Sequence, residues 1–170
     1  MYKRQVYKNA NSQTEANTPI EDYIFDSNGN LVYPTGATTG CQMHYESYLY
    51  CDTLKWVNNE WINYILPQTY WAQNHSLAPY ERLINWWNQA VSKKNVNLYA
   101  GMGIYMWLTN TNEAYEQLVI NDALEHVKGT SIYSYKQIAA AYNNTDVSAK
   151  EQMNDIKNYV WKNKTILPKI

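Results

Sequence analysis

The chain has 170 residues, a formal net charge of -1 and a sequence pI near 6.3. This length fits one domain with one core. The near-neutral charge argues against nucleic acid as a partner, and no apolar run approaches the roughly 18 residues of a membrane span. Only 17% of the residues are charged, whereas 17 Tyr and 7 Trp dominate the aromatic set. Such uncharged polarity suits neutral, hydroxyl-rich ligands such as sugars, although a genomic composition bias would produce the same pattern.

The cysteine and histidine content predicts neither a disulfide framework nor a metal site. Cys41 and Cys51 are too few for such a framework, and we expect two unpaired thiols, with a single disulfide as the alternative. The three histidines are far apart in the sequence and join no Cys/His cluster: they are His44, His75 and His126. No cofactor is predicted. No apolar signal segment is visible near the N-terminus, and we expect residues 1–5 to be a spurious leader before Val6.

The first third of the chain predicts a hairpin and then a helix. Asn28-Gly29 lies between two apolar runs, which is typical of a tight hairpin turn, so we expect a hairpin near residues 22–33. The same turn lacks the length and the terminal Glu of a calcium loop. From about residue 42 to residue 58, apolar side chains recur every three or four positions, which predicts an amphipathic helix.

Three short apolar runs downstream predict buried strands, and each is followed by a helical pattern. The expected strands are 62–66, 96–100 and 130–134. The first helix should run from Pro79 to about Lys93, with inward side chains from Leu83, Trp87, Ala90 and Val91. The second should follow a cap at Thr111 or Asn112, with Tyr115, Leu118 and Val119 on its buried face. The third should open with a capping box at residues 148–151, with Met153, Ile156 and Val160 inward.

The strands are expected to start near Ile62, Val96 and Thr130, which are 34 residues apart both times. Regular alternation of strand and helix at this interval predicts right-handed βαβ units on a parallel sheet. Two architectures fit, a small open sheet or part of an eight-fold βα barrel. Because a whole barrel needs about 250 residues, a barrel interpretation assigns this chain roughly its C-terminal half.

Aromatic and amide side chains follow each expected strand. In parallel α/β folds, ligands bind at the carboxyl ends of the strands and in the loops after them. Flat rings can stack on the apolar face of a pyranose, and amides can both donate to and accept from its hydroxyls. The candidate sugar-binding residues are Gln68, Tyr70, Trp71, His75, Tyr105, Trp107 and Tyr135. The alternative is that the Tyr and Trp side chains only cap the core, and that His75 is a solvated loop residue rather than a general acid or base.

The expected strand ends carry no Asp or Glu. Glycoside hydrolysis usually needs two carboxylates about 5 to 10 Å apart across the scissile bond, so we predict no catalytic acid pair in this chain. Gly101-Met102-Gly103 hints at a phosphate cradle, but the third glycine of the dinucleotide fingerprint is missing. Close backbone packing explains this motif better.

Several segments of the chain resemble the glycosyl-hydrolase-like family 10 proteins, which are bacterial secreted or lipid-anchored proteins. The most specific of them is the run from Glu60 to Trp71, with its Pro-Gln-Thr-Tyr-Trp end. Further matching segments are 6–9, 52–57, 80–87, 97–101 and 129–134. The resemblance therefore spans almost all of residues 6–168, in the order of the family.

The resemblance implies an α/β fold, the C-terminal half of a (β/α)8 TIM barrel with strands six to eight and their helices. Residues 6–170 would be a partial glycoside hydrolase barrel domain, with the hairpin near residues 22–33 inserted after strand five. Gln68, Tyr70 and Trp71 match family positions on the substrate side, and Gly101 matches a close-packing position. The acidic motif of the family near strand four has no counterpart here.

The function implied is that of a fragment of a glycoside hydrolase that acts on a bacterial polysaccharide, such as peptidoglycan glycan strands. The chain would supply substrate subsites, be inactive alone, lie outside the cell or in its envelope, and self-associate through its exposed half-barrel edges. Two alternatives stay open from the residues. One is a stand-alone carbohydrate-binding module, and the other is a phosphate-ligand domain that uses Gly101-Met102-Gly103.

Overall fold

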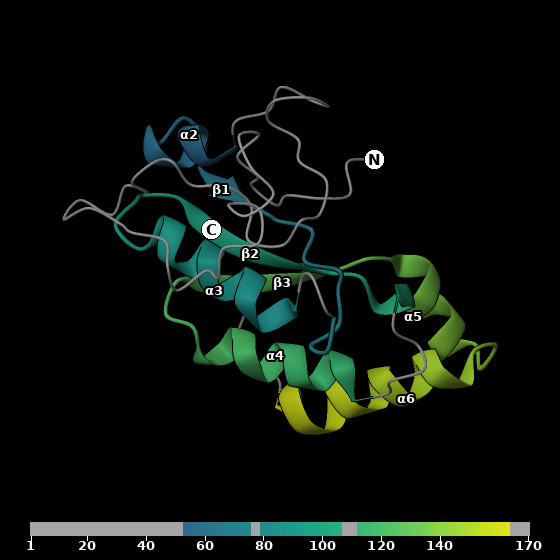
Figure 1. The fold of residues 1–170 in the computed structure, drawn as a ribbon. Coiled ribbons are helices and arrows are strands. Elements are labelled where there is room, and N and C mark those ends of the chain that lie inside the picture. The colour runs from purple at the N-terminus through teal and green to yellow at the C-terminus, as the bar shows by residue number, and fades with distance from the viewer. Residues whose placement is uncertain (1–52, 76–78, 107–111, 164–170) are drawn as a thin grey trace.

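The structure is a computed structural model, and it describes residues 53–75, 79–106 and 112–163 (Figure 1). The expected leader, the hairpin near residues 22–33, both cysteines and most of the helix expected at 42–58 lie outside the described residues. Of that helix, α2 covers Thr53–Asn58. Among the described residues, no helix is long and apolar enough to cross a membrane.

Within the described residues, three parallel strands form one sheet in the order β1-β2-β3. They are β1 at Tyr64–Ile65, β2 at Asn97–Met102 and β3 at Val127–Ile132. Tyr64 pairs with Asn97 in the first ladder, and Met102 pairs with Ile132 in the second. The prediction of parallel βαβ units is therefore confirmed, and the α/β fold is compatible with part of a barrel.

The strand boundaries differ from the prediction, most of all at the third strand. The third strand is present, but its expected bounds of 130–134 are wrong, because β3 begins at Val127, which pairs with Leu98, and ends at Ile132. Its end is set by the next element, since the Ser134 backbone N–H and Oγ–H both donate to Gln137 Oε1, at 3.2 and 2.9 Å. This local cap starts a helix that the sequence analysis missed.

Five α-helices are present in the described residues, together with a short 3-10 turn and a π-helical turn. They are α2, α3 at Tyr80–Val91, α4 at Glu113–Ala123, α5 at Tyr135–Tyr142 and α6 at Val147–Asp155, with η2 at Ile104–Met106 and η3 at Ile156–Val160. In Figure 1, α3 and α4 lie on the same side of the sheet.

The predicted inward face of α3 is confirmed. Its buried side chains include all four expected residues, Leu83, Trp87, Ala90 and Val91. Trp86 is also buried, and its ring meets that of Trp87 edge to face at a centroid distance of 4.9 Å. The apolar core contains these α3 side chains except Leu83, together with the alternate residues Leu98, Ala100 and Met102 of β2.

Alternation along the strands puts a second set of positions on the opposite face of the sheet. On β2 these are Tyr99 and Gly101, and the ladder aligns them with Gly129 and Ser131 of β3. Gln68, which follows β1, forms an isolated parallel bridge with Gly101. It therefore lies in register with Gly101 and Ser131 across the sheet. One face of the sheet therefore packs against α3 and α4. The opposite face carries Tyr99 and Gly101, and Gln68 of the segment after β1 pairs with it at Gly101.

Two expectations about the C-terminal helices are corrected, and two are confirmed. Val119 does not face the core, because it is 47% exposed, whereas Leu118 is buried as predicted. The expected capping box at residues 148–151 is wrong, since α6 begins two residues earlier and the Asp146 side chain accepts from the Ala149 backbone N–H. The inward positions of this helical segment are confirmed, with Ile156 in the core and Met153 and Val160 packed against it.

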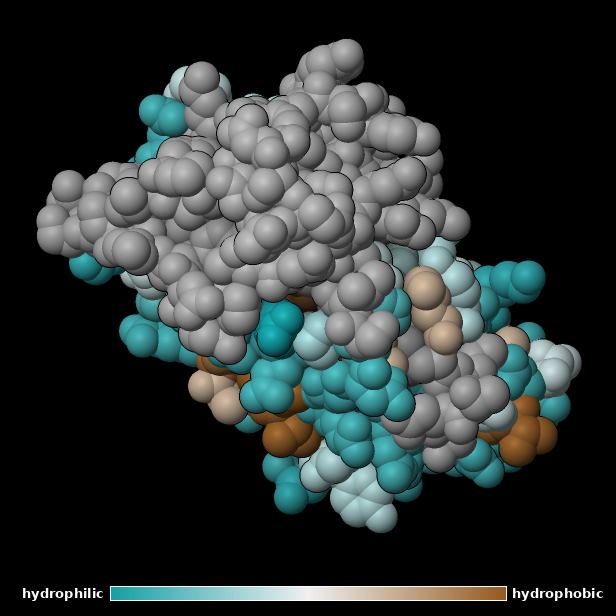
Figure 2. All heavy atoms as spheres, in the orientation of Figure 1, coloured by the Kyte–Doolittle hydropathy of each residue, from teal (hydrophilic) through white to brown (hydrophobic). Residues whose placement is uncertain are grey.

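Figure 2 shows that the described surface on the face drawn is mainly hydrophilic, with small separate hydrophobic spots. Across the described residues, the large exposed apolar side chains include Trp61 before β1, Tyr64 in β1 and Trp161 after η3. β1 and β3 are the two edges of the described sheet.

Candidate functional site

Three tyrosines from the segments after β1, β2 and β3 form one aromatic group, which we call the tyrosine cluster. Tyr70 stacks on Tyr133, with centroids 5.7 Å apart and planes inclined by 20°. Tyr105 meets both rings edge to face, at 6.1 Å from Tyr70 and 5.8 Å from Tyr133. The carboxyl ends of three successive parallel strands thus deliver three rings to one place.

Two glycines of β2 and its end make room for the segment after β1. A Cβ atom on Gly103 would lie 2.6 Å from Tyr70 Cγ, and one on Gly101 would lie 2.5 Å from the Pro67 carbonyl oxygen. Both distances are too short for a side chain. The close-packing interpretation of Gly101-Met102-Gly103 is therefore confirmed.

Burial changes the acidity of the central ring of the tyrosine cluster. Tyr70 is buried, and its desolvation, with smaller effects from Tyr105 and Tyr133, raises its pKa to about 12. A buried phenol resists ionisation because the phenolate would lose its hydration. Tyr70 therefore stays protonated at neutral pH and serves as a neutral hydroxyl, not as a base.

Gln68 precedes Tyr70 by two residues and is held by β2. The Gly101 backbone N–H donates to the Pro67 carbonyl, and the Thr69 N–H and Oγ–H both donate to the Gly101 carbonyl, all at 2.9 to 3.0 Å. Within the part of the chain that the structure describes, Gln68 Oε1 is buried and has no hydrogen-bond partner. An amide acceptor of this kind can take a hydrogen bond from a ligand hydroxyl.

Trp71 and His75 form a second aromatic pair next along the chain. Their ring centroids are 6.0 Å apart. Trp71 is buried and His75 is partly buried, and desolvation lowers the pKa of His75. The imidazole is therefore mostly neutral at pH 7, and one ring nitrogen can accept a proton or a hydrogen bond.

The structure brings some of the expected site residues together and separates others. Tyr70 and Tyr105 are in contact, with Gln68, Trp71 and His75 on the segment that carries Tyr70. Trp107 lies outside the described residues. Tyr135 is not in the tyrosine cluster, because it is the first residue of α5 and is 80% exposed. Tyr133 occupies the position in the tyrosine cluster that was expected for Tyr135. A predicted strand end at Ile132 would have identified Tyr133, because it is the first residue after the strand.

The described segments directly after the strands carry no Asp or Glu. Glu113, the first residue of α4, is the buried carboxylate that the sequence analysis missed. Its Oε1 accepts from the Gln73 backbone N–H and from Gln117 Nε2. In the described ranges, no three His, Cys, Asp or Glu residues are grouped so that they could hold a metal ion.

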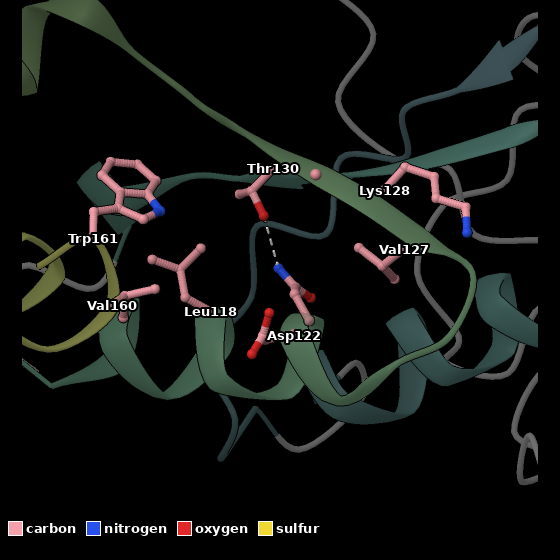
Figure 3. Close-up of a pocket in the computed structure, with 9 residues that line it drawn as sticks. Leu118, Asp122, Val127, Lys128, Thr130, Val160 and Trp161 are labelled. Atoms are coloured by element: carbon pink, nitrogen blue, oxygen red, sulfur yellow. Dashed lines mark hydrogen bonds between the residues drawn. The ribbon is translucent and has the colours of Figure 1, made fainter. Parts of the chain in front are cut away.

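A cavity of about 200 Å³ lies elsewhere, between α4, β3 and the end of η3 with Trp161 (Figure 3). Trp161 and Val160 stand at one end, and Val127 and Lys128 stand at the other. The cavity lies along β3 up to Thr130, whereas the tyrosine cluster receives Tyr133, which follows the end of that strand. It is therefore separate from the candidate site.

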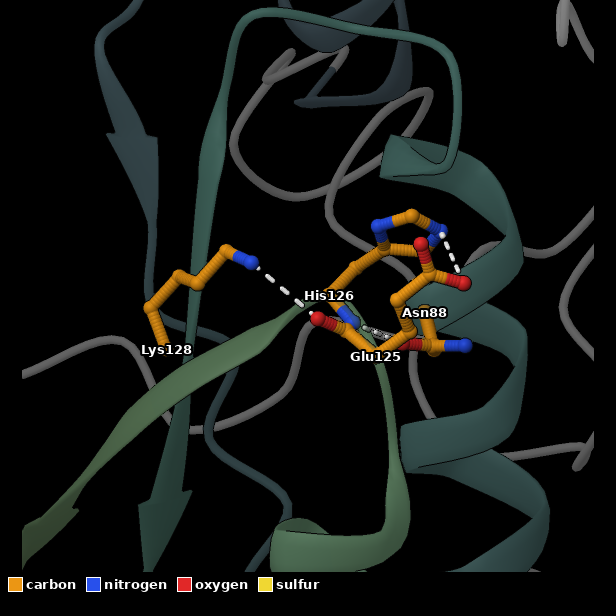
Figure 4. A network of polar contacts seen from close by, with 4 residues as sticks. All are labelled: Asn88, Glu125, His126 and Lys128. Carbon is orange, nitrogen blue, oxygen red and sulfur yellow. Dashed lines mark hydrogen bonds and ion pairs between the residues drawn. The ribbon is translucent and has the colours of Figure 1, made fainter.

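The turn between α4 and β3 forms a polar contact at the opposite end of the sheet (Figure 4). The His126 backbone N–H donates to Asn88 Oδ1 at 3.0 Å, and Lys128 Nζ donates to the Glu125 carbonyl at 3.0 Å. The first of these bonds ties α3 to the start of β3. This bond lies at the amino end of β3, so it supports the sheet at the end opposite to the candidate site, which lies at the carboxyl ends of the strands.

Comparison with protein families matches the chain to Glycosyl hydrolase-like 10 over residues 32–120. Among curated proteins, it is similar to Glycosyl hydrolase YngK of Bacillus subtilis (strain 168), with 34% identity over 112 residues, or 62% of this chain and 22% of the relative. It is also similar to Glycosyl hydrolase DigH of Escherichia coli (strain K12), with 34% identity over 113 residues, or 59% of this chain and 25% of the relative.

The chain thus spans about a quarter of the length of the relatives that it matches. The matched region includes β1, β2 and the segments after them that carry Gln68, Tyr70 and Tyr105. Because the family match covers more than half of the sequence, the chain belongs to the glycosyl hydrolase-like 10 family.

Proposed function

We propose that this chain forms one side of a glycan-binding cleft in a glycoside hydrolase. The observation that carries the proposal is the tyrosine cluster, because three strand ends converge on it where parallel α/β folds bind ligands. The curated relatives named glycosyl hydrolase support the reaction class. The substrate that we propose is a bacterial polysaccharide such as peptidoglycan glycan strands, which would place the protein in the cell envelope or outside the cell.

Each residue of the site has a chemical role in this proposal. Tyr105 and Tyr133 offer ring faces for stacking on a sugar, and Tyr70 supports both rings. Gln68 Oε1 accepts from a sugar hydroxyl, and Trp71 with His75 extends the cleft along the chain. Trp107, which follows η2 in the sequence, is kept as a further stacking residue, whereas Tyr133 replaces Tyr135.

We assign β1, β2 and β3 to strands six to eight of a (β/α)8 barrel, within a domain of residues 6–170. The sheet order β1-β2-β3 supports this assignment, because successive strands of such a barrel are neighbours. The expected hairpin near residues 22–33 would be an insertion after strand five. The catalytic carboxylates would come from elsewhere in the parent protein, since the described strand ends carry none.

The sheet edges lead to a related proposal about association. The strands of all-parallel sheets usually lie inside a fold, so unpaired edges attract other strands. Exposed Trp61 precedes the edge strand β1, exposed Tyr64 lies in β1, and exposed Trp161 lies beside β3. We propose that the chain alone self-associates through these edges, and sizing chromatography that gives a single monomer peak would contradict this.

Binding of glycan by the full 170-residue chain tests the proposed function. N-acetylglucosamine oligomers and purified peptidoglycan glycan strands are titrated while tryptophan fluorescence is followed. We expect saturable binding that weakens about tenfold in Tyr133→Ala and in Gln68→Ala. The first variant loses an aromatic contact and the second loses a hydrogen bond, and each contributes about 0.5–1.5 kcal/mol. Tyr142→Ala is the matched control, since Tyr142 is an exposed tyrosine on α5.

We expect the chain alone to have no catalytic activity. No new reducing ends should appear when it is incubated with either probe. A folded wild-type chain that binds neither probe, or variants of the tyrosine cluster that bind as the wild type does, would overturn the proposal. Turnover by the chain alone would overturn the assignment of the catalytic acids to another part of the protein.

A further inference from the structure

Helix α4 carries three buried polar residues at four-residue intervals, which we call the polar stripe. Glu113, Gln117 and Asn121 are 1%, 0% and 5% exposed. Residues spaced by four lie on the same face of a helix, so all three point in one direction. A helix that packs on a sheet normally buries an apolar stripe, and a polar one needs a specific set of partners.

The first two residues of the polar stripe hold the segment after β1 by its backbone. The Gln73 N–H donates to Glu113 Oε1 at 2.8 Å, and Gln117 Nε2 donates to the Trp71 carbonyl at 3.1 Å. Gln117 Nε2 also donates to Glu113 Oε1 at 2.7 Å, so the two side chains brace one another. The bonds meet the backbone on both sides of Ala72, between Trp71 and His75.

The other contacts of this segment continue the same arrangement. Gln73 Oε1 accepts from the Glu81 backbone N–H at 3.2 Å, which links the segment to the start of α3. Asn121, the third residue of the polar stripe, accepts from the Tyr80 hydroxyl at 2.7 Å and donates to Thr130 Oγ1 at 3.1 Å. The polar stripe thus ties together the segment after β1, the first residue of α3 and a residue of β3.

The polar stripe gives directional contacts that an apolar stripe would not give. Apolar packing does not specify direction, whereas hydrogen bonds to backbone atoms have preferred distances and angles, so a satisfied network makes a loop rigid. The carboxylate of Glu113 also lies in the first turn of α4, where the helix dipole favours negative charge. We propose that Glu113 and Gln117 are positioning residues that hold Trp71 and His75 beside the tyrosine cluster in the binding-competent arrangement. This inference rests on the proposed glycan-binding function.

Three variants on the same helix test this role. Glu113→Ala removes the acceptor of both N–H groups, whereas Glu113→Gln keeps an oxygen at the same position and should restore the bonds. Leu118→Ala is the matched control. Leu118 follows Gln117 on α4 and is also buried, but it belongs to the apolar core. All three are made in the full chain, and their melting temperatures are measured first.

Hydrogen exchange at the Gln73 amide is the primary measurement, since it needs no ligand. We expect exchange at least tenfold faster in Glu113→Ala and near the wild-type rate in Glu113→Gln. Leu118→Ala lowers the melting temperature without singling out this amide. The second measurement is the affinity for N-acetylglucosamine oligomers, for which Kd should rise about tenfold in Glu113→Ala and return in Glu113→Gln.

The two measurements separate the failure of this inference from the failure of the proposed function. If the wild type binds the oligomers and Glu113→Ala binds equally well with a protected Gln73 amide, the positioning role is wrong. If Leu118→Ala weakens binding as much as Glu113→Ala at the same melting temperature, the effect is general destabilisation and the role is again wrong. If the wild type binds no glycan while Gln73 exchange responds as expected, the polar stripe holds the segment but the proposed function fails.

Discussion

The ring of Tyr70, which follows β1, stacks on the ring of Tyr133, which follows β3, at a centroid distance of 5.7 Å. β2 lies between these two strands in the sheet, so the contact passes over the end of the middle strand. Gly103 makes this passage feasible, because it follows β2 and has no side chain. Stacked aromatic pairs contribute about 0.5–1.5 kcal/mol beyond their buried area. The contact therefore couples the outer strands of the described sheet.

Gly103→Ala should disrupt this arrangement. The new Cβ would lie 2.6 Å from Tyr70 Cγ, so the ring has to move away from Tyr133. We expect a loss of stability of about 1–3 kcal/mol, as for other overpacked sites, measured by urea unfolding. Gly129→Ala is the control, since its Cβ would lie 3.2 Å from Tyr99 Cδ1 and needs only a small shift. Equal unfolding midpoints for Gly103→Ala and the wild type would contradict the packing described here.

The raised pKa of Tyr70 predicts a loss of stability in alkaline solution. Folding raises this pKa to about 12, whereas an unfolded tyrosine ionises near 10, so the unfolded chain releases its proton first as the pH rises. The contribution of Tyr70 is therefore complete below about pH 10 and is lost between about pH 10 and pH 12. Burial raises the pKa of Tyr80 as well, which acts in the same direction.

Tyr70→Phe should flatten part of this alkaline decline, as measured by urea unfolding between pH 9 and pH 11. In the folded protein, the difference in phenolate absorbance between wild type and Tyr70→Phe should have its midpoint near 12 rather than near 10. A midpoint near 10 would show that the ring is hydrated, and the tyrosine cluster would then be less buried than described.

The apolar pattern of the sequence was sufficient to predict α3 and the sheet. Leu83, Trp87, Ala90 and Val91 are buried as their helical spacing requires, and all three strands were found in parallel order. The boundary of β3 was wrong because Val127 to Gly129 is not a continuous apolar run. The pairing of Val127 with Leu98 extends the strand there, and that contact is tertiary.

The candidate site was only partly predictable from the sequence, for two physical reasons. The sequence pattern favours Tyr135 over Tyr133 because it predicts a strand end at Ser134, two residues beyond the observed end of β3, and α5 starts at the next residue. Glu113, Gln117 and Asn121 were missed because they are polar residues at buried positions. Their partners are backbone and side-chain atoms distant in the sequence, so an apolar periodicity could not reveal them.

Removal of one hydroxyl should test the third residue of the polar stripe. Tyr80→Phe keeps the buried ring but deletes the hydrogen bond to Asn121 Oδ1, which is then left buried without that donor. We expect a loss of about 1–3 kcal/mol in the free energy of unfolding, from thermal or urea unfolding. Tyr115→Phe is the control, because Tyr115 is partly exposed on α4. If Tyr80→Phe is as stable as its control, the hydrogen bond between Tyr80 and Asn121 does not stabilise the folded protein.

The start of α6 distinguishes two alternative helix caps. In the structure, Asp146 Oδ1 accepts from the Ala149 backbone N–H at 2.9 Å, whereas the sequence pattern favours Ser148 as the cap. Asp146→Ala should therefore cost about 1 kcal/mol, Asp146→Asn should cost much less because asparagine also caps helices well, and Ser148→Ala should be nearly neutral. Thermal unfolding of the three variants measures these differences. If Ser148→Ala is the most damaging of the three, α6 begins at the capping box and not at Val147. The loss of stability in Asp146→Ala should also affect the packing of the apolar core. The reason is that α6 continues directly into η3, whose Ile156 is fully buried.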